Sequence, residues 1–202
     1  MLAESKVRKL TPDEYLELEE KAEFKSEYWD GVMIPLHGNS PELSGVTENH
    51  AQIVTNLVAT LLPEAKRRNC RVLATDLKVW VDKHRRFFYP DILIVCGASV
   101  YYKEKRTAIC NPKILIEVLS KSTESNDRGD KFEAYRTLDS LEEYILIAQS
   151  KPVVEQFVKQ TDGSWKLWAT IGLESTITLF SFDLAVKLTE IYDLVEFRSE
   201  EI

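Results

Sequence analysis

Two short apolar runs in the middle of the chain have the pattern of buried β-strands. They occupy residues 88–95 and 112–119, and a proline lies near the start of each. Runs of Ile, Leu and Val of this length, bounded by turn residues, are typical of central strands in a sheet. Each run nevertheless carries one carboxylate, Asp91 or Glu117. Acidic side chains are seldom buried without compensation of their charge, so this pair is the first candidate for chemistry.

Hydrophobic and turn patterns elsewhere predict alternating helices and strands. Helices are predicted at residues 11–23, from Thr47 to a kink or end near Pro63, at 127–138 and at 188–195. Further strands are predicted at residues 71–73, 142–148, 176–180 and 75–82, the last with one polar face, and hairpins around Asp30-Gly31 and Asp162-Gly163. Residues 35–45, 97–111 and 120–126 have the composition of loops, the first of them a candidate flap. This order predicts an α/β (α+β) fold with a mixed central sheet flanked by helices and extended by hairpins.

Composition places the chain among ordinary globular proteins. Its 202 residues are 44% hydrophobic and 29% charged, which predicts one domain over residues 1–202 with a frayed tail at 197–202. The chain has neither a membrane-length apolar run nor a signal-peptide pattern, so we expect a cytoplasmic protein without membrane contact. Cys70, Cys96 and Cys110 are odd in number and form no CxxC pair, which predicts reduced thiols.

The charge balance bears on nucleic-acid partners. A net charge of −7 argues against a protein that coats nucleic acid non-specifically, because phosphate affinity comes from clustered Lys and Arg. Three basic groups, residues 66–68, 83–86 and 103–106, are candidates for contact with a DNA backbone, although each alone is more typical of a solvated turn or helix end. The sequence contains no helix-turn-helix, zinc-finger, P-loop or GxGxxG pattern.

Asp91 and Glu117 suit a divalent metal site. If their strands pair, the faces that carry the two carboxylates can coincide. Two ionised carboxylates would repel each other in a low dielectric, whereas a shared cation favours the charged form of both. Mg²⁺, or Mn²⁺ in its place, takes oxygen ligands and keeps several waters. One of these waters could attack phosphorus while the metal offsets charge on the phosphate, so the pair predicts a metal-dependent phosphodiesterase.

A lysine beside this pair would orient the attacking water and stabilise the transition state. Asp127, Lys131 and Tyr135 recur at four-residue spacing on the helix that follows the Glu117 strand, which makes Lys131 the favoured candidate. The alternative is an exposed Asp–Lys helix pair, which is common and weak. Lys113 and Lys78 are rival lysines.

His50 and Glu48 are candidate supporting residues. His50 falls on the apolar face of the helix that begins after Thr47. It is therefore either a buried, hydrogen-bonded core histidine or, like Glu48, part of an active site. The three histidines and three cysteines lack the spacing of zinc ligands.

The order of these motifs resembles that of the PD-(D/E)XK nuclease superfamily. The residues that carry the resemblance are Pro90-Asp91, Glu117-Val118-Leu119-Ser120, the helix with Asp127, Lys131 and Tyr135, and residues 141–146. The family most similar to this chain is the Uma2-type family of small "putative restriction endonuclease" proteins. The resemblance implies a restriction-endonuclease-like core, with metal held by Asp91, Glu117 and the main-chain carbonyl of Val118. Leu119 stands where the superfamily has a lysine, and the resemblance implies that Lys131 replaces it.

Two main functional hypotheses follow. The first is a Mg²⁺-dependent endonuclease that hydrolyses DNA, working as a homodimer because double-strand cleavage needs two sites. The second, which Leu119 and the acidic charge favour, is a non-catalytic member of the fold that binds nucleic acid or a protein partner. A purely structural role for the two acids is disfavoured by the cost of burying carboxylates. Phe157, Trp165 and Trp168 in a late hairpin predict the homodimer interface, unless they pack on the protein's own sheet.

Overall fold

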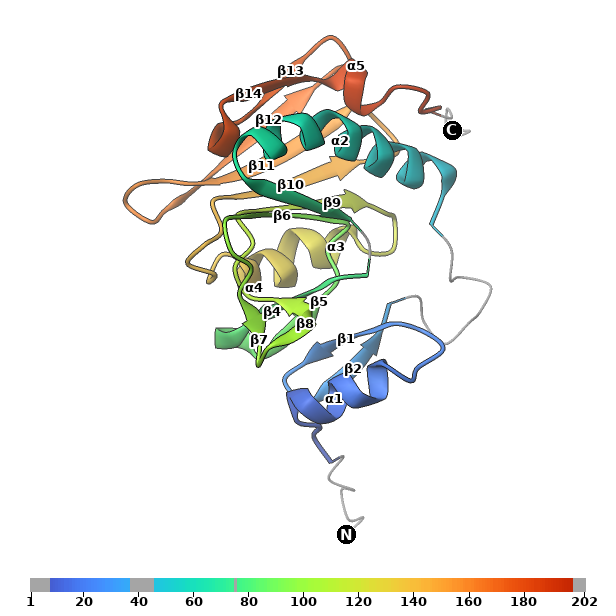
Figure 1. Ribbon diagram of the computed structural model, residues 1–202. Helices are drawn as coiled ribbons and strands as arrows, with labels where there is room; N and C mark the ends of the chain where they lie inside the picture. Colours follow the sequence, from blue (N-terminus) through green and yellow to red (C-terminus); the bar gives the residue numbers. More distant parts are fainter. Residues whose placement is uncertain (1–7, 37–45, 75, 198–202) are drawn as a thin grey trace.

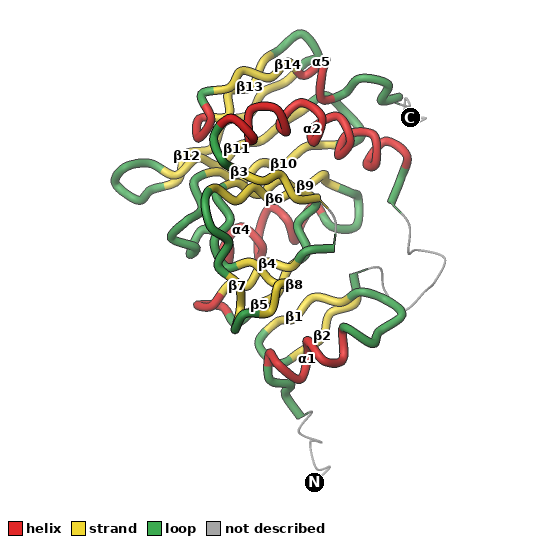
Figure 2. The backbone as a smooth tube through the Cα atoms, viewed as in Figure 1, coloured by secondary structure: helices red, strands yellow, loops and turns green. Residues whose placement is uncertain are grey.

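Two six-stranded sheets with a helical segment between them make up most of the structure (Figure 1 and Figure 2). The computed structural model describes residues 8–36, 46–74 and 76–197. Most of the predicted flap, residues 37–45, and the tail from residue 198 lie outside the described residues. The combination of helices with sheets of mixed strand direction confirms the predicted α+β class.

The central sheet has the strand order β12-β11-β10-β9-β6-β3. β9 and β10 run parallel, whereas the other neighbours are antiparallel. The helical segment that joins β9 to β10 provides the crossover that a parallel pair requires. The strands of this sheet are β3 (Cys70–Ala74), β6 (Ile92–Cys96), β9 (Ile114–Leu119), β10 (Glu143–Ala148), β11 (Val153–Lys159) and β12 (Trp165–Ile171).

The second sheet has the strand order β2-β1-β5-β4-β8-β7. The hairpin predicted at Asp30-Gly31 joins β1 to β2, and both turn residues have the positive φ that a tight hairpin turn requires. The strands are β1 (Ser26–Trp29), β2 (Val32–Pro35), β4 (Lys78–Val81), β5 (Arg86–Phe88), β7 (Tyr101–Tyr102) and β8 (Lys105–Ile109), and a separate pair is formed by β13 (Thr176–Leu179) and β14 (Leu184–Lys187).

Helices cover both faces of the central sheet (Figure 1). One face packs against α2 (Glu48–Arg67) and α5 (Leu188–Ile191), and the other against a segment made of α3 (Glu124–Asn126), η3 (Asp127–Lys131) and α4 (Phe132–Tyr135). Odd-numbered residues of β9 therefore face α4 and the second sheet. α1 (Pro12–Glu19) packs beside β1. No helix in the described parts of the chain is long and apolar enough to cross a membrane.

α2 continues through Pro63 to Arg67, whereas the sequence predicted a kink or an end near Pro63. A proline inside a helix removes one backbone hydrogen bond and crowds the preceding turn. The buried side chains Leu57, Leu61 and Ala65 lie on both sides of Pro63 and pack in one core with the central sheet. We infer that this packing outweighs the lost hydrogen bond.

The strand predicted at residues 88–95 is divided between the two sheets. β5 ends at Phe88 in the second sheet, and β6 begins at Ile92 in the central sheet. Pro90, in the connection, has no N–H to donate to a strand ladder. Asp91 therefore lies at the junction of the two sheets, immediately before β6, and not inside a strand as predicted.

Several other element boundaries differ from the prediction. Residues 101–109 form the β7–β8 hairpin instead of an irregular link, the third helix runs from Glu124 to Tyr135 instead of 127–138, and β14 was not predicted. α1 and α5 are shorter than expected. β4 lacks the predicted polar face, because Lys78 and Trp80 are buried as well as Val79 and Val81. Its position between β5 and β8, with packed cores on both sides, accounts for this burial.

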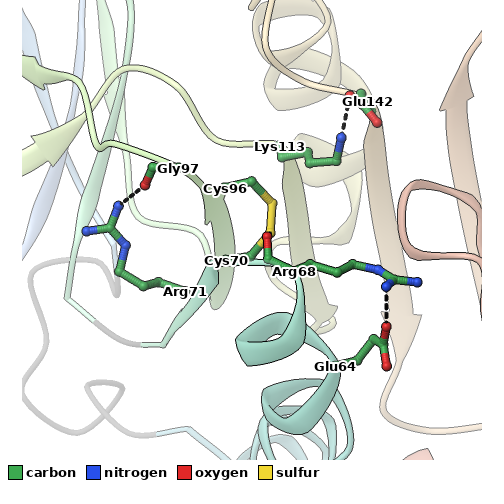
Figure 3. The surroundings of a disulfide bond; sticks show 8 residues. All are labelled: Glu64, Arg68, Cys70, Arg71, Cys96, Gly97, Lys113 and Glu142. Atoms are coloured by element: carbon green, nitrogen blue, oxygen red, sulfur yellow. Dashed lines mark hydrogen bonds and ion pairs between the residues drawn. A yellow bond between two sulfur atoms is a disulfide. The ribbon is translucent and has the colours of Figure 1, made fainter.

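Cys70 and Cys96 form a disulfide, which corrects the prediction of three reduced thiols (Figure 3). The two residues are direct partners in the antiparallel pairing of β3 with β6. The pairing brings them together across 26 residues of sequence, so the spacing of the cysteines gave no sign of it. Cys110 is the free cysteine in the described part of the chain.

Candidate active site

The pairing of β6 with β9 brings Asp91 and Glu117 to the same place in the sheet. The strands are antiparallel, with Ile92 opposite Ile116 and Leu93 opposite Leu115. Extending this register by one residue places Asp91 opposite Glu117. Leu93 and Leu115 both belong to the core that faces α4, and side-chain alternation assigns Glu117 to the same face.

Asp91 is held through one of its two carboxylate oxygens. Asp91 Oδ2 accepts a hydrogen bond from the Val118 N–H at 2.7 Å and lies 3.2 Å from His50 Nε2. Asp91 Oδ1 has no hydrogen-bond partner among the described residues. His50 is buried in the first turn of α2. It is therefore a hydrogen-bonded core histidine whose partner is a candidate metal ligand.

Glu117 is 3% exposed and also uses one oxygen. Lys131 Nζ donates to Glu117 Oε1 at 3.2 Å and the Tyr135 hydroxyl donates to it at 3.4 Å. Within the described chain, Glu117 Oε2 accepts no hydrogen bond. Burial raises the pKa of Glu117 well above its usual value; the charge of Lys131 opposes this rise and the neighbouring carboxylates add to it. A second cation near Glu117 would therefore favour its ionised form.

Lys131 is 5% exposed and contacts three carboxylates. Its Nζ lies 3.2 Å from Glu117 Oε1, 3.0 Å from Asp127 Oδ1 and 3.5 Å from Glu27 Oε1. The contacts to Asp127 and Glu27 are ionic but are not aligned as hydrogen bonds. Burial alone would lower the pKa of Lys131, but the three carboxylates outweigh it and hold this pKa well above its usual value. Lys131 is thus a buried ammonium, which excludes the alternative of an exposed helix pair.

A π-helical turn carries Lys131. This turn, η3, lies between α3 and α4, where a regular helix was predicted. π-Helical turns, with their i→i+5 hydrogen bonds, are rare overall, but those that occur are frequently at functional sites. The Tyr144 hydroxyl donates to the main-chain carbonyl of Asp127 at 2.9 Å and so ties the turn to β10. Leu119, at the position where the resemblance expects a lysine, is buried in the core against α4.

Glu27 forms one buried cluster with Glu117, Asp127 and Lys131. The sequence did not identify Glu27. It lies in β1 of the second sheet, and it is 2% exposed. The indole N–H of Trp29 donates to Glu27 Oε2 at 3.2 Å. Strand alternation predicts that Glu27 and Trp29 share a face, and a charged residue beside a tryptophan was the available signal. The packing of the second sheet against η3, which brings Glu27 to Lys131, has no signature in the sequence.

Three predicted candidates lie outside the cluster. Glu48 is exposed in the first turn of α2, and its side chain makes no hydrogen bond or ion pair in the described structure. Lys113 pairs with Glu142 at 2.6 Å, at the end of β9 near the disulfide (Figure 3). Lys78 is buried with its Nζ 4.9 Å from the centroid of the Tyr89 ring. The helix lysine is therefore the lysine that reaches Glu117.

Ion pairs with carboxylates of the same chain offset much of the positive charge of the three predicted basic groups. The ion pairs are Arg67 and Arg68 with Glu64, Arg85 with Asp30, and Lys103 and Lys105 with Asp13. Arg86 lies 3.9 Å from Asp130 Oδ1 and also over the Trp29 ring, with its guanidinium carbon 4.3 Å from the ring centroid. These groups present less charge to DNA phosphates than their sequence suggests.

The cluster contains more negative than positive groups. Glu27, Glu117 and Asp127 surround one ammonium, and in the described part of the chain one buried oxygen each of Glu27 and Asp127 accepts no hydrogen bond. No set of three or more His, Cys, Asp or Glu side chains forms a ready-made metal cage within residues 8–36, 46–74 and 76–197. Mg²⁺, however, commonly binds through one or two carboxylates and retains waters. The charge excess and the unpartnered oxygens of Asp91 and Glu117 fit such an ion.

Comparison with known proteins relates most of the chain to one family. A family model described as "Uma2: Putative restriction endonuclease" matches residues 12–188. The Synechocystis sp. protein sll1609 is 33% identical over 182 residues, which cover 90% of this chain and 98% of that protein. The Synechocystis sp. protein slr1290 is 31% identical over 157 residues, 78% of each chain.

A solved structure shares the fold. It is described as that of "a putative nuclease belonging to DUF820" from Anabaena variabilis ATCC 29413, and it covers 93% of this chain and 99% of its own with a TM-score of 0.71 at 19% identity. This likeness confirms the predicted restriction-endonuclease-like architecture. With the family model and the Synechocystis relatives, it leads to one conclusion: the chain belongs to the Uma2 family of "putative restriction endonuclease" proteins.

Proposed function

We propose that the protein is a Mg²⁺-dependent endonuclease that hydrolyses phosphodiester bonds of DNA. The observation that carries this proposal is the placement of Asp91 opposite Glu117, with the buried ammonium of Lys131 against Glu117. Membership of the Uma2 family supports nuclease chemistry. Asp91, Glu117 and the main-chain carbonyl of Val118 would hold Mg²⁺, or Mn²⁺ in its place.

Each residue of the site has a role that follows from its contacts. The Val118 N–H and His50 orient Asp91, and Tyr135 and Lys131 orient Glu117, in each case through one oxygen that leaves the other for a cation. When bound, the ion would supply an activated water and offset charge on the scissile phosphate. The ammonium of Lys131, held against Glu117, would supply fixed positive charge to offset the charge that develops on the phosphate.

We further propose that the enzyme works as a two-fold homodimer. β12 is the edge of the central sheet and pairs, within the described residues, with β11. It exposes Leu167, Trp168 and Ile171, and an exposed apolar edge strand is a template for pairing with another chain. Antiparallel pairing of two β12 strands about a two-fold axis would continue the sheet through both copies. Phe157 and Trp165 do not contribute to this edge, because they pack on Phe132 of the same chain.

Cleavage of supercoiled plasmid tests the proposed activity. We expect nicking or linearisation by the wild type in Mg²⁺ or Mn²⁺ and none in EDTA. Glu117→Gln, Asp91→Asn and Lys131→Met should each reduce turnover by about a hundredfold or more, as is typical for loss of a preorganised electrostatic group. Lys113→Met is the matched control for Lys131→Met, since Lys113 lies at the other end of β9, and it should retain wild-type turnover.

The same assay distinguishes the second hypothesis. Wild-type cleavage no higher than the Glu117→Gln blank, on plasmid, single-stranded DNA and RNA, would contradict the nuclease proposal. The protein would then be a nuclease-fold binding module, an alternative favoured by Leu119 and by the enclosure of Lys131 among carboxylates.

A further inference from the structure

Glu27 reaches the proposed site from an element that carries none of its other residues. β1 lies in the second sheet, whereas Glu117 lies in the central sheet and Lys131 in the helical segment between the sheets. Extending the β1–β5 register by one residue places Glu27 opposite Phe88. The Phe88 ring lies 5.0 Å from the Tyr135 ring, centroid to centroid. Glu27 therefore enters the layer in which Tyr135 and Lys131 meet Glu117.

The contacts of Glu27 are not those of a carboxylate with a purely structural role. Among the described residues, Oε2 alone has a hydrogen-bond donor, the Trp29 indole, and a glutamine could accept that hydrogen bond equally well. Oε1 is buried without a hydrogen bond and lies 3.5 Å from Lys131 Nζ. Burying a carboxylate oxygen without a hydrogen bond costs free energy unless an opposite charge lies close to it. The charge that it faces is the ammonium of Lys131.

A divalent ion on Glu117 would change the electrostatic balance around Lys131. Glu117 accepts a direct hydrogen bond from the ammonium at 3.2 Å, and its charge would then be shared with the ion. Asp127 and Glu27 are the carboxylates left to hold Lys131, from its own helix and from the second sheet. Two carboxylates on different elements hold the ammonium in position and also stabilise its charged form.

We propose that Glu27 is a positioning residue for Lys131. It keeps the ammonium beside the phosphate when Glu117 binds the ion, so that the β1–β2 hairpin completes the catalytic site. This inference rests on the proposed function, because it assigns Glu27 to the same reaction. Glu27 acts through Lys131 and touches neither the substrate nor the ion.

A double-mutant cycle with two readouts tests the inference. The first readout is thermal unfolding in EDTA, which is independent of activity. Lys131→Met should lower the Tm of the wild type, because it leaves buried carboxylates without their cation. In a Glu27→Gln background the same substitution should lower the Tm by a smaller amount. We expect the two losses of Tm to differ by at least about 3 °C, as is typical of side chains in contact.

The second readout is plasmid cleavage. Glu27→Gln should lower kcat by about tenfold or more with little change in KM, the size of effect seen when a group that orients an active-site residue is lost. Glu27→Asp, which keeps the charge, should retain more activity than Glu27→Gln. In a Lys131→Met background, Glu27→Gln should cause no further loss. Glu143→Gln is the control, because Glu143 is equally buried but accepts its hydrogen bond from the Ser181 N–H at the far end of β10.

Failure of this inference differs from failure of the proposed function. Additive Tm effects, or equal losses of kcat in both backgrounds, would overturn the role of Glu27 while leaving the nuclease intact. Coupled Tm values with an unchanged kcat for Glu27→Gln would reduce the contact to a structural ion pair and overturn the positioning role as well. Absence of wild-type cleavage would instead sink the proposed function, whatever the Tm cycle shows.

Discussion

Lys131 is a buried ammonium held by three carboxylates from the central sheet, its own helix and the second sheet. Asp127 and Tyr135 could be assigned from helical spacing, and Glu117 from its place in an apolar strand. Glu27 could not, because its contact with Lys131 depends on how the second sheet packs against η3. The burial of Lys131 was likewise invisible, since an i,i+4 Asp–Lys pair in a sequence is usually a solvated one. Local spacing therefore predicts which residues share a face but not what that face meets.

Burial of Glu117 gives a testable dependence of stability on pH. The folded-state pKa of Glu117 is raised well above 4.5, chiefly by burial. A group with a raised pKa contributes stability that is complete below its unfolded pKa and is lost as pH rises through the folded value. Each unit of the rise is worth about 1.4 kcal/mol. The metal-free protein should therefore lose stability as Glu117 ionises above pH 4.5.

Glu117→Gln removes this ionisation. In EDTA its Tm should equal that of the wild type near pH 4.5 and exceed it by at least about 3 °C at pH 8. Millimolar Mg²⁺ should reduce this difference by stabilising only the wild type. Scanning calorimetry across this range measures both effects. Parallel Tm curves for the two proteins would show that Glu117 does not titrate with a raised pKa.

At the scale of elements, the long regular patterns were predicted and the junctions were not. β9, β10, the two hairpins and α2 lie where apolar periodicity and turn residues placed them. The errors occur where tertiary packing overrides a local rule. α2 passes Pro63 because its neighbours are buried, and β4 loses its polar face because it is central in its sheet. The Cys70–Cys96 bridge depends on strand register, which cysteine spacing does not encode.

The candidate site lies at two interruptions of regular secondary structure. Asp91 stands where the chain leaves one sheet for the other, and Lys131 stands in a π-helical turn. Both positions break a regular pattern that the sequence otherwise follows. Functional sites are often the places where local consistency fails. Here neither break was predicted, because a continuous strand was expected through Pro90 and a regular helix through Lys131.

At the scale of the whole molecule, the edge strand β12 predicts an assembly. In this strand Trp168 is 42% exposed and Ile171 is 70% exposed. Trp168 stacks on Phe180, which is itself exposed. We expect light scattering at micromolar concentration to give the mass of a dimer. Ile171→Lys should shift the protein towards the monomer by placing a charged side chain on the apolar edge strand, whereas Val100→Lys, at an exposed valine outside β12, should not. A monomeric wild type would contradict the proposed homodimer.

We propose that Asp91 and Glu117 hold a divalent ion between the two sheets. Anomalous diffraction from crystals soaked in Mn²⁺ tests this proposal, because it locates the ion independently of any substrate. We expect a peak within coordination distance of one oxygen from each carboxylate, with Lys131 Nζ still beside Glu27 and Asp127, and no peak in Asp91→Asn crystals. A wild-type map without a peak at this position, at saturating Mn²⁺, would contradict it.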